Sequence, residues 1–189
     1  MDGALSERIP DGTRVADYDY ELPPGRIARY PAERRDESRL LVVPPEGPFR
    51  HLRFRDLVDL VEPGDLLVVN ESKVLPVRLL GRKPTGAPSE ILLVRPVPGA
   101  EDERLWEALV RPGSKLKPGR TVVVGEELSV EILDSAPGSG RVVRLVTALP
   151  VEEALARHGH VPLPPYLERE DEPLDRERYQ TVYARAPGS

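Results

Sequence analysis

Four polar residues that could bind or activate a ligand stand directly after an apolar run. Asn70, Glu71, Ser72 and Lys73 follow the Leu-Leu-Val-Val run at residues 66–69. Proteins of the α/β class place ligands at such strand ends, because a rigid core fixes side chains that face solvent. A crossing loop between domains, in which these residues only cap and hydrogen-bond, is the alternative. The residues alone leave both interpretations open.

A second group of polar residues lies in a tight turn. Arg111 and Lys115 enclose Pro112, Gly113 and Ser114, so the turn offers two cations and a hydroxyl. Such a turn is suited to an anion, because charged donors form the stronger hydrogen bonds. It can equally be a turn and nothing more.

Aromatic and amide side chains in two later segments could face a nucleobase. Tyr166 lies in the proline-rich stretch 161–167, which must be extended, so its ring could stack on a base at little ordering cost. Arg178, Tyr179 and Gln180 add a guanidinium fork, a ring and an amide. A strap over the core and a buried helix face are the alternative interpretations of the two segments.

The composition excludes several classes of protein. The 189 residues are 39% hydrophobic, enough for a packed core, and the absence of cysteine excludes disulfides and cysteine nucleophiles. His158 and His160 could offer two imidazoles to a metal, but a third ligand is missing, so no metal is expected. No apolar run approaches the ~20 residues that span a bilayer, and residues 1–19 do not resemble a signal peptide. We expect a soluble, cytoplasmic protein that does not enter a membrane.

Charge is distributed unevenly along the chain. The formal net charge is −5, yet residues 72–120 hold ten Lys and Arg against five Asp and Glu. Residues 1–71 and residues 121–189 each have a net charge of −5. A basic block can meet nucleic-acid phosphates. It can also be a solvated surface whose charges balance acidic neighbours in the fold.

Hydrophobic periodicity predicts the elements that would position these residues. A helical period predicts helices at 54–61, 150–157 and 174–184. Residues 38–43 and the apolar run at 65–70 are predicted strands, the second one buried. Six short strands separated by Pro-Gly turns are predicted at 74–80, 90–95, 105–110, 121–124, 128–133 and 141–146.

These elements predict an α+β fold in which α/β flanks enclose an inserted antiparallel β-barrel-like module. Regularly spaced short strands favour a sandwich or a barrel, in which closure hides the sheet edges. We expect a flexible leader at 1–16 and a β-barrel-like domain at 72–148. The α/β domain is expected to combine 17–71 with 149–189.

Seven ordered motifs run from residue 17 to the end of the chain. They lie at 17–23, 35–42, 54–65, 69–79, 106–113, 162–166 and 178–184. Three of them read Val-Asn-Glu-Ser-Lys-Val-Leu-Pro-Val-Arg-Leu, Trp-Glu-Ala-Leu-Val-Arg-Pro-Gly and Arg-Tyr-Gln-Thr-Val-Tyr-Ala. In this order the motifs resemble the S-adenosylmethionine:tRNA ribosyltransferase-isomerase family of queuosine biosynthesis.

The resemblance implies an unusual use of S-adenosylmethionine. Family members transfer and isomerise its ribosyl moiety onto 7-aminomethyl-7-deazaguanine at the wobble position of tRNA, which gives epoxyqueuosine and releases adenine and methionine. The sulfonium acidifies the neighbouring ribose carbon, so a general base can start the sequence. The implied partners are S-adenosylmethionine, as ribosyl donor, and tRNA that carries the deazaguanine precursor. A monomer without a metal is expected.

The resemblance also implies roles for the candidate residues. Glu71 and Lys73 are the expected catalytic residues, with Glu71 as the carboxylate base and Lys73 positioning ligand. Arg111 and Lys115 are expected to contact tRNA phosphate. The expected substrate-binding residues are Asn70, which would position ligand, Arg39 and Arg78, which would hold anionic groups, and Tyr166, Tyr179 and Gln180, which would face a base.

One departure from the family concerns the end of the chain. In the family, Gly188 and Ser189 run into an Ala-Pro-Thr-Ala-Gly-Leu-His-Phe-Thr-like motif and a further region, whereas this sequence stops. The resemblance therefore implies an N-terminal portion that folds and binds tRNA weakly without catalysing. A non-catalytic RNA-binding β-barrel module is the alternative function, and a β-barrel protein-interaction domain is a third.

Overall fold

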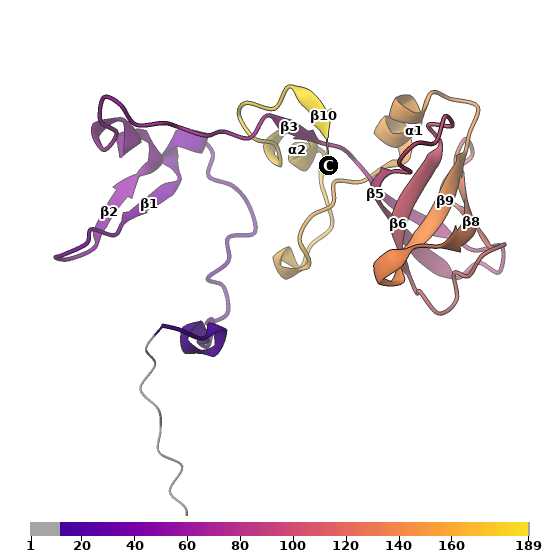
Figure 1. Cartoon of the computed structure of the whole chain (residues 1–189), viewed down its shortest axis with the longest axis horizontal. Helices are drawn as coiled ribbons and strands as arrows, with labels where there is room; N and C mark the ends of the chain where they lie inside the picture. The colour runs from indigo at the N-terminus through magenta and orange to yellow at the C-terminus, as the bar shows by residue number, and fades with distance from the viewer. Residues whose placement is uncertain (1–11, 189) are drawn as a thin grey trace, which may run out of the picture.

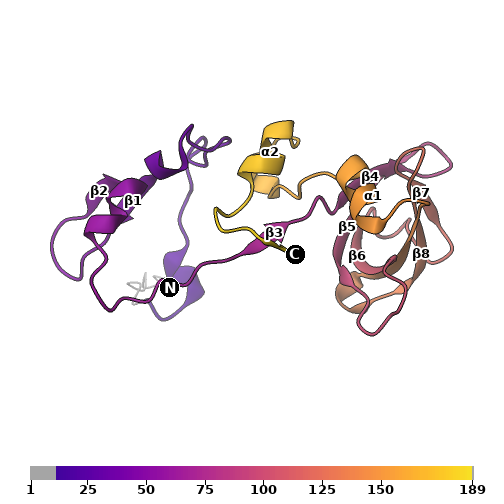
Figure 2. The same cartoon turned by 90° about the horizontal axis from the view of Figure 1, so that it is seen from above.

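Three parts follow one another along the molecule in the structure, a computed structural model that describes residues 12–188. A hairpin of β1 (Arg39–Val42) and β2 (Arg50–Arg53) lies at one end (Figure 1). The middle part contains α2 (Pro173–Arg178) and the parallel pair of β3 (Ser72–Val74) with β10 (Ala186–Gly188). A β-barrel forms the other end, and Figure 2 shows the same order from above.

Six antiparallel strands close the barrel, which confirms the predicted β-barrel-like module. The strands pair in the order β4-β5-β6-β9-β8-β7, and β7 pairs back with β4. Their bounds are Arg78–Arg82 for β4, Pro88–Pro96 for β5, Leu105–Arg111 for β6, Thr121–Val123 for β7, Ser129–Ser135 for β8 and Arg141–Val146 for β9. Each turn lies where the sequence has Pro-Gly or a similar breaker, because these residues end strands.

Short helices complete the described chain. The α-helix α1 (Val151–His158) follows the barrel and confirms the helix predicted at 150–157. Besides α1 and α2, the helical elements are short 3-10 helices, η1 (Val15–Tyr18), η2 (Arg35–Glu37), η3 (Phe54–Asp59), η4 (Pro137–Ser139) and η5 (Pro165–Leu167). The predicted leader, 1–16, lies largely outside the described residues.

The hydrophobic core fills the barrel. Alternate residues point inward, so Ile91 and Leu93 of β5 and Val130 and Ile132 of β8 are at most 2% exposed. Leu116, in the loop between β6 and β7, is fully buried at the same core. Among the described residues, every buried apolar side chain belongs to residues 77–161. The rest of the described chain is therefore held by polar contacts and by half-buried side chains.

Barrel closure depends on a glycine. A Cβ atom at Gly81 of β4 would lie 2.5 Å from the carbonyl oxygen of Val123 and 2.6 Å from the Val122 side chain on β7. Non-bonded carbon and oxygen atoms do not approach this closely, so any side chain here would separate the two strands. The Arg82–Val123 pair that joins β4 to β7 is next to this contact.

The predicted buried strand at 65–70 is wrong. This segment is extended, but it pairs with no strand of the described chain, and Leu66, Leu67, Val68 and Val69 are 52–88% exposed. An apolar run predicts burial only where another surface covers it, and no described element does so here. Figure 1 shows the segment crossing between the hairpin and the middle part.

Two predicted helices differ from the structure in form or length. The helix predicted at 54–61 is the 3-10 helix η3 and ends at Asp59. Its Phe54 and Val58 are 51% and 74% exposed, so this part of the apolar stripe lacks a covering surface. The helix predicted at 174–184 is α2 and ends at Arg178. Arg35 occupies the carbonyls at its end, since its guanidinium donates to the oxygens of Glu177, Arg178 and Gln180.

Leu116→Ala tests the core that the barrel builds around its longest loop. We expect the free energy of unfolding to fall by about 2–5 kcal/mol, because a fully buried leucine leaves a cavity. Urea unfolding followed by the fluorescence of Trp106 measures this loss. Leu109→Ala, at a half-exposed position of β6, is the matched control and should cost less than about 1 kcal/mol. Equal losses in the two variants would contradict the assignment of Leu116 to the core.

Candidate functional site

The segment from Asn70 to Lys73 is extended and tied at both ends. The side-chain oxygen of Asn70 accepts the Ser72 amide at 2.8 Å, and the Glu71 carbonyl accepts the Arg185 amide at 2.8 Å. The side chains of Glu71 and Lys73 are exposed and form no hydrogen bond or ion pair within residues 12–188. A fixed backbone therefore presents a free carboxylate and a free ammonium to solvent.

Gln180 extends the β3 ladder with its side chain. Its Oε1 accepts the Val74 amide and its Nε2 donates to the Val74 carbonyl, both at 2.8 Å. The neighbouring Thr181 hydroxyl donates to the Asn70 carbonyl at 3.0 Å. Gln180 thus stabilises the segment that carries Glu71 and Lys73. Both polar groups of its amide bond the Val74 backbone. A contact of Gln180 with a nucleobase stays a prediction.

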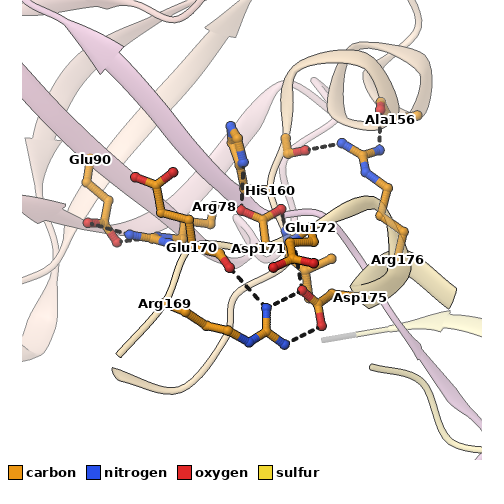
Figure 3. A network of polar contacts seen from close by, with 12 residues as sticks. Arg78, Glu90, Ala156, His160, Arg169, Glu170, Asp171, Glu172, Asp175 and Arg176 are labelled. Atoms are coloured by element: carbon orange, nitrogen blue, oxygen red, sulfur yellow. Dashed lines mark hydrogen bonds and ion pairs between the residues drawn. The ribbon is translucent and has the colours of Figure 1, made fainter. Parts of the chain in front are cut away.

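A polar network joins the barrel to the segment that follows α1 (Figure 3). The Arg78 guanidinium donates to both oxygens of Glu90, at 2.9 and 3.4 Å, and Glu90 raises the pKa of Arg78. The backbone of Arg78 pairs with that of His160 through two hydrogen bonds of 2.8 and 3.2 Å. His160 Nδ1 lies 2.8 Å from a carboxylate oxygen of Asp171.

The His160–Asp171 pair has a geometry suited to proton transfer. A carboxylate that bonds one ring nitrogen fixes the orientation of the imidazole and leaves the other nitrogen for a substrate. The side chain of Asp171 is 7% exposed and that of His160 is 39% exposed. The second oxygen of Asp171 accepts the Val161 amide at 3.1 Å, so the carboxylate is held in place while the ring reaches solvent.

A buried ion pair lies next to this network. Arg169 donates to the two carboxylate oxygens of Asp175 at 2.6 and 2.7 Å, and the side chains are 10% and 5% exposed. These hydrogen bonds lower the pKa of Asp175. Arg169 also covers the ring of Tyr30 at 4.6 Å from its centre and donates to the Arg29 carbonyl. The pair therefore joins the N-terminal segment to α2.

The remaining predicted site residues are spread over the molecule. Tyr179 lines a cavity of about 230 Å³ beside Tyr30 and Arg169, and Tyr166 is exposed on η5. Arg39 lies in the β1–β2 hairpin, in a cleft of about 260 Å³. Arg111 and Lys115 lie on the barrel. The structure thus brings Asn70, Glu71, Lys73 and Gln180 together at β3, with Arg78 at the start of the barrel, and places the others elsewhere.

Sequence reasoning missed the acidic partners of the network. Asp171 and Asp175 lie in the mixed stretch 169–178, where spacing does not reveal which cation each carboxylate meets. Asp175 did carry a local signal, because Pro173 marks a helix start and an acidic residue two positions later can cap it. The Glu172 amide does donate to Asp175 at 2.8 Å.

Residues 12–188 contain neither a metal-binding cluster of side chains nor a helix that could span a membrane. Within residues 12–188, no set of three or more His, Cys, Asp or Glu side chains is arranged to hold a metal ion. No helix in this part of the chain is both long and apolar enough to cross a membrane.

Comparison with known proteins identifies the family. Residues 15–189 match the family described as queuosine biosynthesis protein. The chain belongs to this family. The family match confirms the resemblance carried by the seven motifs.

Two curated relatives carry the name S-adenosylmethionine:tRNA ribosyltransferase-isomerase. The protein from Pelotomaculum thermopropionicum is 50% identical over 178 residues, and that from Anaeromyxobacter sp. is 47% identical over 179 residues. Each match covers 93% of this chain and about half of the relative, 50% and 51%. The chain therefore spans about half the length of the curated relatives it matches, which agrees with the prediction of a partial family member.

A solved structure of the family also matches. It is the S-adenosylmethionine tRNA ribosyltransferase from Thermotoga maritima, with 37% sequence identity and a TM-score of 0.37. The match covers 80% of this chain and 52% of that one.

Arg169→Gln tests the buried pair through its pH dependence. A lowered folded-state pKa of Asp175 stabilises the fold above the ordinary carboxyl pKa of about 3.9, and this stability is lost as the pH falls through the lowered value. We expect the variant to be less stable than the unsubstituted protein at pH 7, and this deficit to shrink at acidic pH, because a protonated Asp175 no longer needs a cationic partner. Urea unfolding at several pH values between 7 and 3 measures the difference.

The exposed pair of Arg34 with Asp36 supplies the control. Arg34→Gln should cost no more than about 1 kcal/mol at any pH, because solvent screens the pair. A deficit in Arg169→Gln that stays constant from neutral to acidic pH would contradict the role of the ionised Asp175.

Proposed function

We propose that this chain takes part in the reaction named by its curated relatives, the transfer and isomerisation of the ribosyl moiety of S-adenosylmethionine onto tRNA. The observation that carries the proposal is 47–50% identity to two relatives over 93% of the chain. The acceptor is 7-aminomethyl-7-deazaguanine at the wobble position, and the products are epoxyqueuosine-containing tRNA, adenine and methionine. The reaction is a tRNA modification in the synthesis of queuosine. We propose that it takes place in the cytoplasm.

The β3 segment is the proposed catalytic element. Glu71 acts as the base that removes a proton next to the sulfonium, and Lys73 positions the ligand. Both side chains are free in the described structure, and their backbone is fixed by Gln180 and β10. A free carboxylate on a fixed backbone meets the first need of general base catalysis, which is a positioned proton acceptor.

Residues around this element are proposed to bind substrate. Arg78 donates to Glu90 through Nε and Nη2, and the donors of its Nη1 hold an anionic group. His160, oriented by Asp171, supplies a second proton-transfer group, which the departing adenine needs at its leaving nitrogen. Further substrate contacts are proposed for Asn70, Arg39, Tyr166, Tyr179 and Gln180, and tRNA contacts for Arg111 and Lys115.

A non-catalytic RNA-binding module is the second candidate. The observation in its favour is that the barrel has its own closed sheet and core, with cationic clefts at one end. Adenine release distinguishes the two candidates, since only the enzyme releases adenine.

Adenine release from S-adenosylmethionine in the presence of precursor tRNA tests the proposal. The assay uses a protein of the relatives' length that contains this chain, and it is repeated with Glu71→Gln. We expect this variant to be slower by about 10²–10⁴-fold, the usual contribution of a positioned base.

Glu46→Gln is the matched control, because Glu46 is an exposed glutamate in the chain segment between β1 and β2. It should retain the unsubstituted rate. The absence of adenine from the unsubstituted protein would favour the RNA-binding module, and an unchanged rate in Glu71→Gln would remove Glu71 from the site.

A further inference from the structure

Unpaired cations gather at one end of the barrel. A cleft of about 370 Å³ lies there, lined by Lys83, Lys115 and Arg120, with the hydroxyls of Thr85 and Thr121 between them. None of the three cationic side chains forms a hydrogen bond or ion pair within residues 12–188. The lining of this cleft contains no carboxylate.

A second, larger cleft is also lined by cations. It has a volume of about 850 Å³ and is lined by Arg82, next to Lys83 in the chain, and by Arg111. Its carboxylates are Glu90, which is engaged by Arg78, and Glu170. Glu131 on β8 pairs with Thr121, which lines the small cleft. Positive charge therefore exceeds negative charge at this end.

The loop that carries Lys115 and Arg120 is held rigidly. Leu116 is buried in the barrel core, and the Arg141 guanidinium donates to the carbonyls of Leu116 at 2.9 Å and Gly113 at 3.0 Å. Near the end of the loop, Gly119 and Arg120 exchange backbone hydrogen bonds of 2.8 Å with Ile132. A ligand that binds here does not have to order the loop, so little binding free energy is lost to entropy.

Arginines elsewhere in the barrel are used differently. At the opposite end, Arg95 bonds both carboxylate oxygens of Glu107, and Arg144 lies 3.6 Å from Asp102. Charges paired in this way contribute little to the attraction of an anion. Clustered cations without partners repel one another, and a bound polyanion removes this cost.

We propose that Lys83, Lys115 and Arg120 form a docking site for the phosphate backbone of RNA, with Arg82 and Arg111 extending it to further phosphates. The inference rests on the proposed function, which supplies the RNA. Five cations over two clefts suit several consecutive phosphates better than one small anion. Phosphate contacts of this kind position a nucleic acid without reading its sequence.

Binding of labelled tRNA to this chain, measured by fluorescence anisotropy at increasing salt, tests the site. The variant K83Q/K115Q/R120Q should bind at least about tenfold more weakly, and the slope of log K against log salt should fall by about 2–3. The control R95Q/R104Q/R144Q removes the same charge from the opposite end of the barrel. It should retain most of the affinity and of the slope.

Each other outcome overturns the inference in a recognisable way. Equal weakening of both triple variants would indicate a general charge effect. Displacement of tRNA by inorganic phosphate more effectively than by chloride of equal ionic strength would indicate a small-anion site. Unchanged binding by K83Q/K115Q/R120Q would remove the site while leaving the proposed function in place, whereas failure of the unsubstituted chain to bind tRNA would contradict both.

Discussion

The close approach of β4 and β7 at Gly81 is the constraint on which the rest of the barrel depends. With no side chain at this position, the carbonyl of Val123 can lie against β4 and the sheet closes. Closure pairs both edges and buries the apolar residues of all six strands around one core. The loop anchored by Leu116 and the turn that carries Lys83 are then held at one end, so the cationic clefts are a consequence of closure.

The sequence predicted the barrel well because its signals are local. Alternating apolar residues and Pro-Gly turns mark each strand, and β9 has the predicted bounds, Arg141–Val146. The same reasoning was wrong for 65–70, since an apolar run contains no information about what covers it. The length of α2 also depended on a distant residue, Arg35, which occupies the carbonyls at its end.

The candidate site likewise has features that the sequence predicted and features that it did not. Motif order placed Asn70, Glu71 and Lys73 in one segment, and the structure shows that this segment is fixed. The contacts that fix β3 could not be predicted, because β10 and Gln180, whose side chain bonds the Val74 backbone, both lie more than a hundred residues away. The choice of Asp171 for His160 likewise follows from the path of the chain after α1, which no periodicity describes.

The use of arginine explains how an acidic protein can present a basic surface. Arg29, Arg35 and Arg178 donate to backbone carbonyls between the two flanks, and Arg169 is committed to Asp175. In the flanks, arginine side chains therefore hold together segments that share little apolar contact. At the loop end of the barrel, Lys83, Lys115 and Arg120 have no such task, and their side chains have no partner within residues 12–188. Because the net charge of −5 repels a polyanion at long range, attraction to RNA must arise within about a Debye length of these side chains.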